Sequence, residues 1–274
     1  MSQSQSGYVD VGDGKVYYER AGQGKPVVFV HAGIVDGGMW DSQWEEFSRH
    51  YSVIRYDTRG VGRSDPVENP VSPRQDLYRV LEHAGVSRAT LVGCSLGGET
   101  ILDAAVERPD LVSELVVVST VPGGFDLQGE PPRYVLDLIA ALQAGDLTLA
   151  SELQVRVSID GPYREPEQVD PQVRQRAAEM NLNALTKGSW LLNAGGPIDP
   201  IDPPVAQRLD QIAIPTLIVA GGLDHPEILR AAETMASGIP GAQKVIMPGC
   251  AHLPNMEQPE NFNRIVLDFL RSRE

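Results

Sequence analysis

An apolar run, a glycine-flanked turn and an apolar helix pattern follow one another without a break between residues 89 and 106. Ala89–Val92 is typical of a short buried strand, and apolar residues at helical spacing begin at Gly98. Between them lies Gly93–Gly97, which reads G-C-S-L-G, a G-x-S-x-G pentapeptide. The close approach of a strand and a helix leaves no room for a Cβ atom at the flanking glycines. The segment predicts a sharp strand-to-helix turn that projects the hydroxyl of Ser95 above a sheet.

Several other apolar runs predict the remaining strands. Runs that are apolar on both faces are typical of a parallel sheet covered on both sides. They lie at Pro26–Val30, Val53–Asp57, Leu115–Val118, Thr216–Ala220 and Lys244–Met247. An N-terminal hairpin (Val9–Val11 with Val16–Tyr18) and helical patterns at Pro73–Ala84 and Asn261–Leu270 accompany them. Strands that alternate with helices predict an α/β fold with a doubly wound, mostly parallel sheet of about eight strands.

One long stretch interrupts this alternation. No strong apolar strand lies between Val118 and Leu217. Proline and glycine clusters there separate helical patterns at Tyr134–Gln143, Leu147–Val157, Pro171–Leu185 and Gly188–Leu192. We therefore predict a helical cap at residues 122–210, inserted between a first core segment (1–121) and a second core segment (211–274).

The charge balance argues against two classes of partner. The 274 residues carry 37 acidic and 23 basic side chains, for a formal net charge of −14. Such a chain lacks the basic surface that binds nucleic acids, and anionic membranes repel it. No apolar segment approaches the roughly 20 residues that span a bilayer. We expect no nucleic-acid partner and no membrane partner, while a homodimer is compatible with the sequence.

The N-terminus and the cysteines bear on the compartment. Met1–Gly7 has neither the basic nor the apolar region of a secretory signal, and we expect it to be a disordered lead-in. Two cysteines fit a reducing compartment, so we expect a cytoplasmic location. Cys94 precedes Ser95, and Cys250 lies two residues before His252. Each is interpreted as a small buried hydrophobe, with a reactive thiol as the alternative.

A serine nucleophile needs a histidine base and a carboxylate that orients the base. In the chain order Ser, acid, His, only His252 follows Ser95 in a suitable place, on the loop after the strand Lys244–Met247. Asp224 comes after the strand Thr216–Ala220, on a glycine-containing turn. Loops at the carboxyl ends of parallel strands meet at one edge of the sheet. We therefore predict Ser95, Asp224 and His252 as a catalytic triad.

Other residues compete for the roles of acid and base. Glu227 lies three residues beyond Asp224 and is the nearest rival acid, whereas Asp199 and Asp202 precede the strand and fit the order less well. His225 adjoins Asp224, and adjacent residues rarely face each other. We expect His225 to line the pocket or the surface.

The oxyanion of a tetrahedral intermediate needs N–H donors beside the serine. One predicted donor is the backbone N–H of Leu96, directly after Ser95. The other is a backbone amide near Gly33, in the loop after the strand Pro26–Val30. His31 precedes the serine in the chain, so we expect it to hold this loop by hydrogen bonds to the backbone.

Together these motifs resemble the α/β-hydrolase superfamily. The resemblance covers nearly the whole chain and is carried by His31–Gly33, the D-x-R-G-x-G-x-S turn within Tyr56–Ser64, Gly93–Gly97, Asp224 and Gly249–His252. Within that superfamily the chain resembles small capped esterases, enol-lactone hydrolases and cofactor-free haloperoxidase-like enzymes. The His-Ala at residues 31–32 departs from the family's usual His-Gly but leaves Gly33 in the donor position. Asp57 and Arg59 are expected to fix their turn by local hydrogen bonds.

The residues and the resemblance imply the same chemistry. Ser95 attacks an ester-like carbonyl, His252 takes its proton, Asp224 holds the imidazole, and water then cleaves the acyl-enzyme. The sequence shows no metal cluster and no dinucleotide fingerprint, so we expect neither a metal nor a cofactor. We predict a serine hydrolase whose partner is a small-molecule ester or lactone. The alternatives are carbon–carbon bond hydrolysis or perhydrolysis by the same triad, or a hydrolase-like small-molecule receptor with slow turnover.

Substrate specificity is expected to lie in the cap and its surroundings. Candidates for lining a substrate pocket, against the alternative of ordinary packing, are the apolar residues Trp40, Phe125, Met180 and Trp190. An anionic substrate would need a cationic partner in the cap. For that role the sequence offers Arg133, Arg156 and Arg164.

Overall fold

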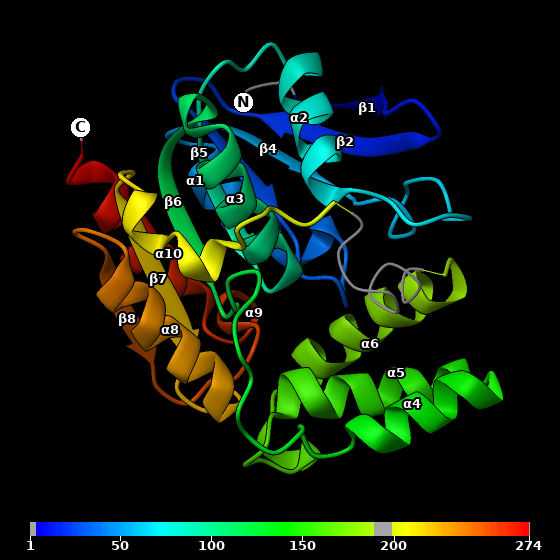
Figure 1. Ribbon diagram of the computed structural model, residues 1–274. Helices are drawn as coiled ribbons and strands as arrows, with labels where there is room; N and C mark the ends of the chain where they lie inside the picture. Colours follow the sequence, from blue (N-terminus) through cyan, green and yellow to red (C-terminus); the bar gives the residue numbers. More distant parts are fainter. Residues whose placement is uncertain (1–3, 189–198, 274) are drawn as a thin grey trace.

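The computed structural model describes residues 4–188 and 199–273. These residues form an eight-stranded sheet at the centre of the molecule, in the order β1-β2-β4-β3-β5-β6-β7-β8 (Figure 1). The strands are β1 (Gln5–Asp10), β2 (Lys15–Ala21), β3 (Pro26–Val30), β4 (Ser52–Tyr56), β5 (Ala89–Cys94), β6 (Val112–Val118), β7 (Thr216–Gly221) and β8 (Gln243–Met247). The predicted α/β fold is confirmed.

The sheet is parallel except at one edge. β1 and β2 form the expected antiparallel hairpin, in which Tyr8 pairs with Tyr17. β2 also runs antiparallel to β4, whereas β4, β3, β5, β6, β7 and β8 pair in parallel. Gln5 to Gly7 belong to β1, so the expectation of a disordered lead-in is wrong for these residues. Pairing with β2 supplies the order that their polar sequence does not indicate.

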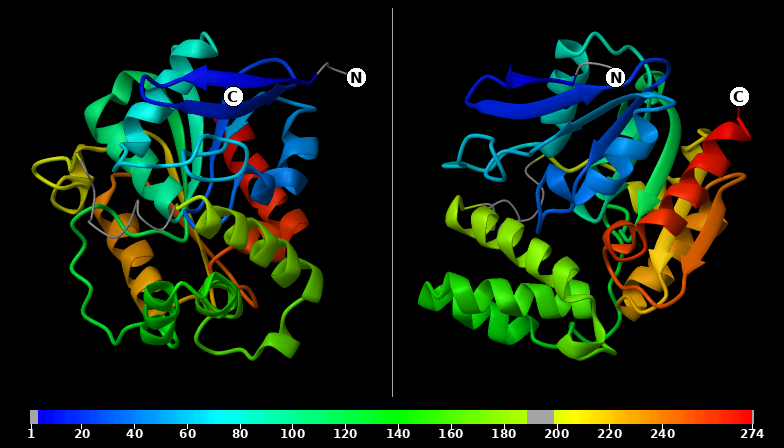
Figure 2. Two further views of the ribbon diagram at one scale, coloured as in Figure 1. Left: turned by 90° about the vertical axis from the view of Figure 1, so that its right-hand side faces the viewer. Right: turned by 180° about the vertical axis from the view of Figure 1, so that it is seen from behind.

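Helices cover both faces of the sheet (Figures 1 and 2). On one face lie α2 (Pro73–His83), α3 (Leu96–Glu107) and α8 (Pro226–Gly238), and on the other α1 (Asp41–Phe47) and α10 (Pro259–Arg271). Successive strand residues point to opposite faces, so Val28 and Val30 of β3 pack with the first set and Phe29 packs with the second. Each such side chain, fully buried, contributes about 1.5–3 kcal/mol to folding. Two covered faces therefore require strands that are apolar throughout.

Helices α4 (Val135–Ala144), α5 (Leu147–Val155) and α6 (Pro171–Thr186) lie together beside the carboxyl ends of the parallel strands (Figures 1 and 2). We call them the cap helices. They follow β6 and precede β7 in the chain, and Leu138, Leu153 and Leu185 join them in an apolar cluster of their own. The predicted helix Gly188–Leu192 lies, apart from Gly188, outside the described residues.

The expected helix at Leu147–Val157 ends early. Regular α-helix stops at Val155, and the chain continues as a π-helical turn, η3 (Arg156–Asp160). The N–H of Gly161 bonds to Arg156 O at 3.1 Å and closes this wider turn. Gly161 then adopts a φ of +71°, which glycine reaches without a steric penalty. A helical hydrophobic pattern does not distinguish these two kinds of turn.

Shorter helical elements complete the described chain. They are η1 (Gly37–Trp40), η2 (Pro109–Leu111), η4 (Pro166–Gln168), η5 (Val205–Gln207), η6 (Leu209–Gln211) and α9 (Pro254–Glu257). None of the helices formed by the described residues combines the length and apolarity needed to cross a membrane.

Candidate active site

Ser95 lies on the turn between β5 and α3. Its backbone has a φ of 52° and a ψ of −117°, a conformation that costs a non-glycine residue about 1–3 kcal/mol. A Cβ on Gly93 would lie 2.3 Å from the carbonyl oxygen of Gly97, and a Cβ on Gly97 would lie 2.3 Å from that of Val30. The strained turn is therefore held by the close approach of α3 to β5 and β3.

Two hydrogen bonds bring Ser95, His252 and Asp224 together. Ser95 Oγ lies 2.9 Å from His252 Nε2, and His252 Nδ1 lies 2.9 Å from Asp224 Oδ2. The other carboxylate oxygen of Asp224 accepts the N–H of His225 at 2.7 Å. Because an ionised carboxylate only accepts, Nδ1 carries the proton and Nε2 accepts the hydroxyl proton of the serine. The site thus holds a hydroxyl, an imidazole and a carboxylate in the arrangement that the predicted triad requires.

The surroundings of His252 favour its protonated form. The side chains of His252 and Asp224 are 15% and 5% exposed. Burial of the imidazole acts to lower its pKa, but the charge of Asp224 and the hydrogen bond to it act the other way and prevail. The pKa of His252 is therefore raised, which strengthens the imidazole as a base toward Ser95.

The two loops that carry the acid and the base are bonded to each other. The N–H of Leu223 donates to Cys250 O at 2.9 Å. A Cβ on Gly221 would lie 1.9 Å from Ala251 O, so the backbones can approach this closely only at a glycine. The ends of β7 and β8 therefore fix the relative positions of acid and base.

The competing residues have other partners or face solvent. Glu227 pairs with Arg230 at 2.5 Å. His225 caps the start of α8, where its Nδ1 accepts the N–H of Glu227 at 3.3 Å. Asp199 pairs with an arginine of α2 at 3.0 Å, and Asp202 is exposed. Of the carboxylates considered in the sequence, the predicted acid is the one bonded to the imidazole.

Both predicted oxyanion donors lie on segments adjacent to the nucleophile. Leu96 is the first residue of α3, and the first N–H groups of a helix have no partner within it. Gly33 lies in the loop after β3, which passes close to the start of α3: a Cβ on Gly97 would lie 2.7 Å from His31 O. That these two N–H groups form an oxyanion hole stays a prediction.

His31 holds this loop through both ring nitrogens. Nδ1–H donates to Ala32 O at 2.8 Å, and Nε2 accepts the N–H of Thr58 at 2.9 Å. The side chain is buried. These are the backbone hydrogen bonds expected of His31, and they tie the loop after β3 to the turn after β4.

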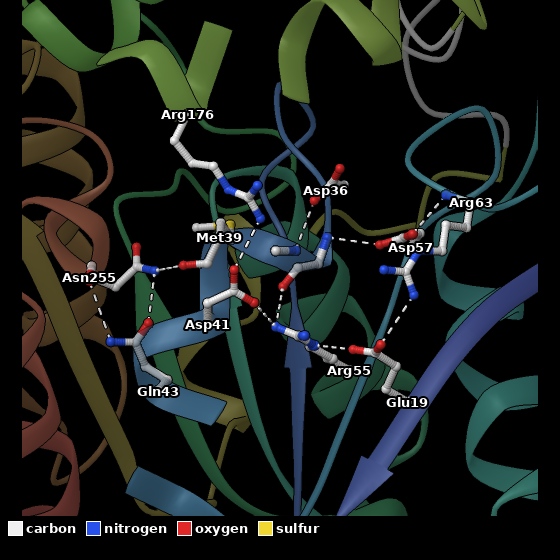
Figure 3. A network of polar contacts seen from close by, with 12 residues as sticks. Glu19, Asp36, Met39, Asp41, Gln43, Arg55, Asp57, Arg63, Arg176 and Asn255 are labelled. Atoms are coloured by element: carbon white, nitrogen blue, oxygen red, sulfur yellow. Dashed lines mark hydrogen bonds and ion pairs between the residues drawn. The ribbon is translucent and has the colours of Figure 1, made fainter. Parts of the chain in front are cut away.

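A network of polar side chains fixes η1, the short helix that follows this loop (Figure 3). Asp57 accepts the N–H of Gly37 at 2.9 Å, and Arg55 donates to Gly37 O at 3.2 Å. Asn255 donates to Met39 O at 2.9 Å. Burial raises the pKa of Asp57. The expected role of Asp57 in a local turn is therefore too narrow, because its carboxylate also holds the start of η1.

Sequence reasoning missed two pairs of residues in or near this network. Arg59 binds both carboxylate oxygens of Asp76 on α2, at 2.9 and 3.0 Å, so its hydrogen bonds are not local. Asn255 donates to Gln43 Oε1 at 3.2 Å across 212 residues of sequence. No spacing within a motif indicates contacts of this range.

A cavity of about 440 Å³ opens beside His252 and Asp224. It lies between the segment that leads from β6 to the cap helices, the turn η3 and the start of α8. Its lining is mainly apolar and includes Leu127, Val135 and Ile228. Apolar walls next to a few convergent polar groups are typical of small-molecule sites.

Trp40, a predicted pocket residue, belongs to the core. Its side chain is fully buried, and its ring lies 5.1 Å from that of Phe29 and 6.1 Å from that of Phe262. The short helix η1 directs it between the sheet and α10. An aromatic residue after a loop fits a core position and a pocket position equally well in sequence, and here it packs in the core.

The other predicted pocket residues do not line the cavity beside His252. Met180 is buried on α6 and lines a separate polar cavity of about 430 Å³. The guanidinium of Arg230 lies over the ring of Phe125, with Arg230 Cζ 4.1 Å from the ring centroid. Trp190 lies outside the described residues.

The three cap arginines differ in their surroundings. Arg133 lines the apolar cavity. Arg156 lies over the ring of Tyr134, and Arg164 is buried against Glu257 at 2.7 Å. In residues 4–188 and 199–273 no group of three or more acidic, histidine or cysteine side chains is arranged to hold a metal ion.

Both cysteines are buried and unsuited to thiol chemistry. Burial raises the pKa of the Cys94 thiol, and it raises that of Cys250 to about 12. Their sulfur atoms lie 3.7 Å from His252 O and 3.4 Å from Met247 O. Because the thiolate is the reactive form, a raised pKa makes a thiol inert. Both residues act as small buried hydrophobes.

The chain is similar in sequence to two bacterial enzymes. The 2-hydroxy-6-oxo-6-phenylhexa-2,4-dienoate hydrolase of Comamonas testosteroni is 27% identical over 277 residues, 96% of this chain and 94% of that protein. The 3-oxoadipate enol-lactonase 1 of Acinetobacter baylyi is 28% identical over 250 residues, 90% of this chain and 88% of that protein.

A solved structure and a family profile complete the comparison. The structure of an N-acyl homoserine lactone degrading enzyme is 25% identical, with a TM-score of 0.74, over 96% of this chain and 100% of that one. The sequence profile of the alpha/beta hydrolase fold family matches residues 25–259. The eight-stranded sheet, the serine turn and this match lead to one conclusion: the chain belongs to the alpha/beta hydrolase fold family.

Proposed function

We propose that this protein is a serine hydrolase that cleaves a small carboxylic ester or lactone through an acyl-enzyme. The observation that carries the proposal is the pair of 2.9 Å hydrogen bonds that joins Ser95 to His252 and His252 to Asp224. A serine hydroxyl is a weak nucleophile by itself, and this arrangement supplies the base that activates it. The similarity to an enol-lactonase adds support.

In the proposed reaction Ser95 Oγ attacks the carbonyl carbon while its proton moves to His252 Nε2. The carbonyl electron pair moves onto oxygen, where the N–H groups of Leu96 and Gly33 stabilise it. Collapse breaks the bond to the leaving oxygen, which takes the proton from His252. Water then attacks the acyl carbon as it gives a proton to His252. The bond from that carbon to Ser95 Oγ breaks, Oγ takes the proton back from His252, and the acid is released. The carboxylate of Asp224 accepts the hydrogen bond of the imidazolium and stabilises it.

The cavity beside His252 supports a neutral substrate with an apolar group. Its volume of about 440 Å³ is within the range of small-molecule sites. Arg133, the cation of the described lining, is paired with Glu165, so the cavity offers an anion no unpaired positive charge. A small or medium-sized neutral ester or lactone is the substrate class that both features favour.

The relative from Comamonas testosteroni favours a second reaction for the same triad. Its name describes hydrolysis of a 2-hydroxy-6-oxo-dienoate. On this chain the corresponding proposal is hydrolysis of a carbon–carbon bond in a vinylogous diketone. Such a substrate is an anion, and the described lining of the cavity holds no unpaired cation to bind it, which makes it the less favoured of the two.

Replacement of the nucleophile tests the proposal. We expect Ser95→Ala to lower kcat for p-nitrophenyl butyrate by about 10⁴-fold or more, because no hydroxyl remains to form the acyl-enzyme. The burst of p-nitrophenol and the acyl adduct detected by mass spectrometry should disappear with it. Ser237→Ala, at an exposed serine of α8, is the matched control and should retain wild-type values. Undiminished turnover by Ser95→Ala would refute the assignment.

A substrate panel separates the candidate reactions. The wild-type enzyme is assayed with p-nitrophenyl esters of increasing acyl length, neutral lactones and a vinylogous diketone. Higher kcat/KM for esters or lactones supports the proposal, and higher kcat/KM for the diketone supports the second reaction. A ligand-induced rise in Tm without turnover of any of them would indicate a receptor.

A further inference from the structure

The loop that carries His252 is bonded directly to the turn η3, which lies between the cap helices α5 and α6. The backbone N–H of His252 donates to Ser158 O, in the turn η3, at 3.2 Å. A Cβ on Gly161 would lie 2.8 Å from Leu223 O and 3.1 Å from the Cβ of Ala251. The turn at residues 156–164, which we call the cap turn, therefore lies against the loop that carries Asp224 and against the loop at residues 248–253 that carries His252, which we call the histidine loop.

A buried carboxylate reinforces this contact. Glu257, on α9, accepts the N–H of Ala251 with Oε1 at 2.7 Å. Its other oxygen, Oε2, accepts from Arg164 Nη1 at 2.7 Å. The side chains of Glu257 and Arg164 are 7% and 9% exposed. One carboxylate thus links Ala251, the residue before His252, to Arg164 on the cap turn.

The guanidinium of Arg164 spans the same junction. Nε donates to Asp160 O at 3.0 Å, and Nη2 donates to Ile159 O at 2.5 Å. Nη1 also donates to Gly249 O, at 3.2 Å, on the histidine loop. Arg164 therefore holds the last residues of η3 and the start of the histidine loop at once, and Glu257 neutralises it.

The cap end of this junction is itself held firmly. Arg174, on α6, donates to both carboxylate oxygens of Asp160, at 2.7 and 3.0 Å. The carboxylate of Asp160 is 2% exposed. Buried pairs leave an uncompensated charge when one partner moves, which keeps the two ends together. The histidine loop is therefore attached to a turn that cannot shift without α6.

We propose that Glu257, acting through Arg164, is a positioning residue that fixes His252 against the cap turn. The inference rests on the proposed function, because it assigns to the pair an effect on the proposed base. Glu257 touches neither Ser95 nor the imidazole, so its effect reaches the reaction through the backbone at residues 249–252. Small displacements of a base are costly, since a shift of about 1 Å lowers a rate by about 10²-fold.

The test compares Glu257→Gln with the wild type on p-nitrophenyl acetate, a substrate too small to need the cap. Gln retains an oxygen for the N–H of Ala251 but no longer neutralises Arg164. We expect kcat to fall about 10- to 100-fold and KM to change less than about twofold. Asp110→Asn is the matched control: it removes the charge from an exposed carboxylate–guanidinium pair with Arg108, beyond the far end of α3. It should leave both constants unchanged.

A double variant separates positioning from stability. In Glu257→Gln/Arg164→Met no charge is left unpaired, so Tm should recover relative to Glu257→Gln. The Arg164→Met change removes the bridge from η3 to Gly249, so kcat should stay low. Joint recovery of Tm and kcat would overturn the proposal. If Glu257→Gln does not fold, Arg164→Lys serves instead, since it keeps the charge but not the three carbonyl contacts. Wild-type kcat in Arg164→Lys would also overturn the proposal.

A readout without turnover keeps this inference separate from the proposed function. The Nδ1–H proton of His252, bonded to Asp224, is followed by NMR of protein labelled with ¹⁵N-histidine. We expect its resonance to shift or broaden in Glu257→Gln and to remain in Asp110→Asn. An unchanged resonance counts against positioning, whether or not the wild type hydrolyses an ester. Failure of the proposed function would show instead as an inactive wild type with the resonance in place.

Discussion

The Asp224 carboxylate has one partner for each oxygen, and together they define its orientation. Oδ1 accepts the N–H of His225, and Oδ2 accepts from His252. A carboxylate that could rotate freely would favour either imidazole tautomer only weakly. Held in this way, it selects the tautomer with its proton on Nδ1, which leaves Nε2 for Ser95.

The pH profile of the reaction depends on this carboxylate. Only neutral imidazole accepts the serine proton, so activity is lost as pH falls through the pKa of His252. Because that pKa is raised, we expect the acidic limb of kcat/KM for a neutral ester to lie above about 6.5, the ordinary histidine value. Asp224→Asn should move the limb to lower pH and lower kcat by about 10⁴-fold.

Steady-state assays across the neutral range check this expectation. Asp210→Asn, at an exposed aspartate of η6, is the control and should keep the wild-type limb. A limb in Asp224→Asn that stays where it is in the wild type would show that Asp224 does not raise the pKa of His252.

At the scale of elements, the close approach of α3 to β3 determines where Ser95 lies. Gly97 leaves no space for a side chain there, because the carbonyl oxygen of Val30 lies where its Cβ would be. The same helix start supplies the N–H of Leu96. The position of one helix therefore sets both the serine and the predicted oxyanion donor.

Gly97→Ala should move the start of α3 away from β3. We expect the free energy of unfolding to fall by about 1–3 kcal/mol, as for overpacked core positions. Turnover of p-nitrophenyl esters should fall as well, because Ser95 and Leu96 shift together. Urea denaturation and kcat measurements check both effects. Gly14→Ala is the control, since its Cβ would make ordinary contacts no closer than 3.5 Å; equal losses in both variants would contradict the steric explanation.

Elements whose own residue pattern determines them could be predicted from the sequence. β3 matches its expected bounds, because a strand buried on both faces is a continuous apolar run. The order of Ser95, Asp224 and His252 predicted their meeting, since the topology brings strand ends to one edge. β1 begins at Gln5, in a polar segment ordered only by its neighbour.

Pairwise contacts between distant segments could not be predicted. Arg164 and Glu257 are 93 residues apart, and each alone is an ordinary charged residue. The burial of Trp40 depends on Phe262, on a helix at the other end of the chain. No periodicity encodes such pairs, because they arise from the packing of elements that each satisfy their own pattern.

At the scale of the whole molecule, the net charge of −14 acts on the substrate before it binds. The field of an acidic protein lowers the local concentration of anions and leaves neutral molecules unaffected. Glu130, an exposed carboxylate of the cavity lining, acts in the same direction.

The salt dependence of catalysis should reveal this field. Raising the ionic strength from about 0.01 M to about 0.15 M shortens the Debye length from about 30 Å to about 8 Å. We expect kcat/KM for an anionic ester such as p-nitrophenyl hemisuccinate to rise several-fold, while that for p-nitrophenyl butyrate stays constant. A fall for the anionic ester would mean that cations near the site outweigh the overall charge.

The contact of the η3 turn with the acid and histidine loops has a consequence for how specificity could be exchanged between relatives. A chimera that replaces all residues between β6 and β7 would lose Ser158, Gly161 and Arg164, the recipient's own support for its base. The graft that preserves the base keeps residues 156–164 with the recipient, together with Arg174, and exchanges only the chain before them. On this proposal residues 156–164 both line the cavity and support the histidine loop, so the two roles meet within the inserted segment and not at its ends.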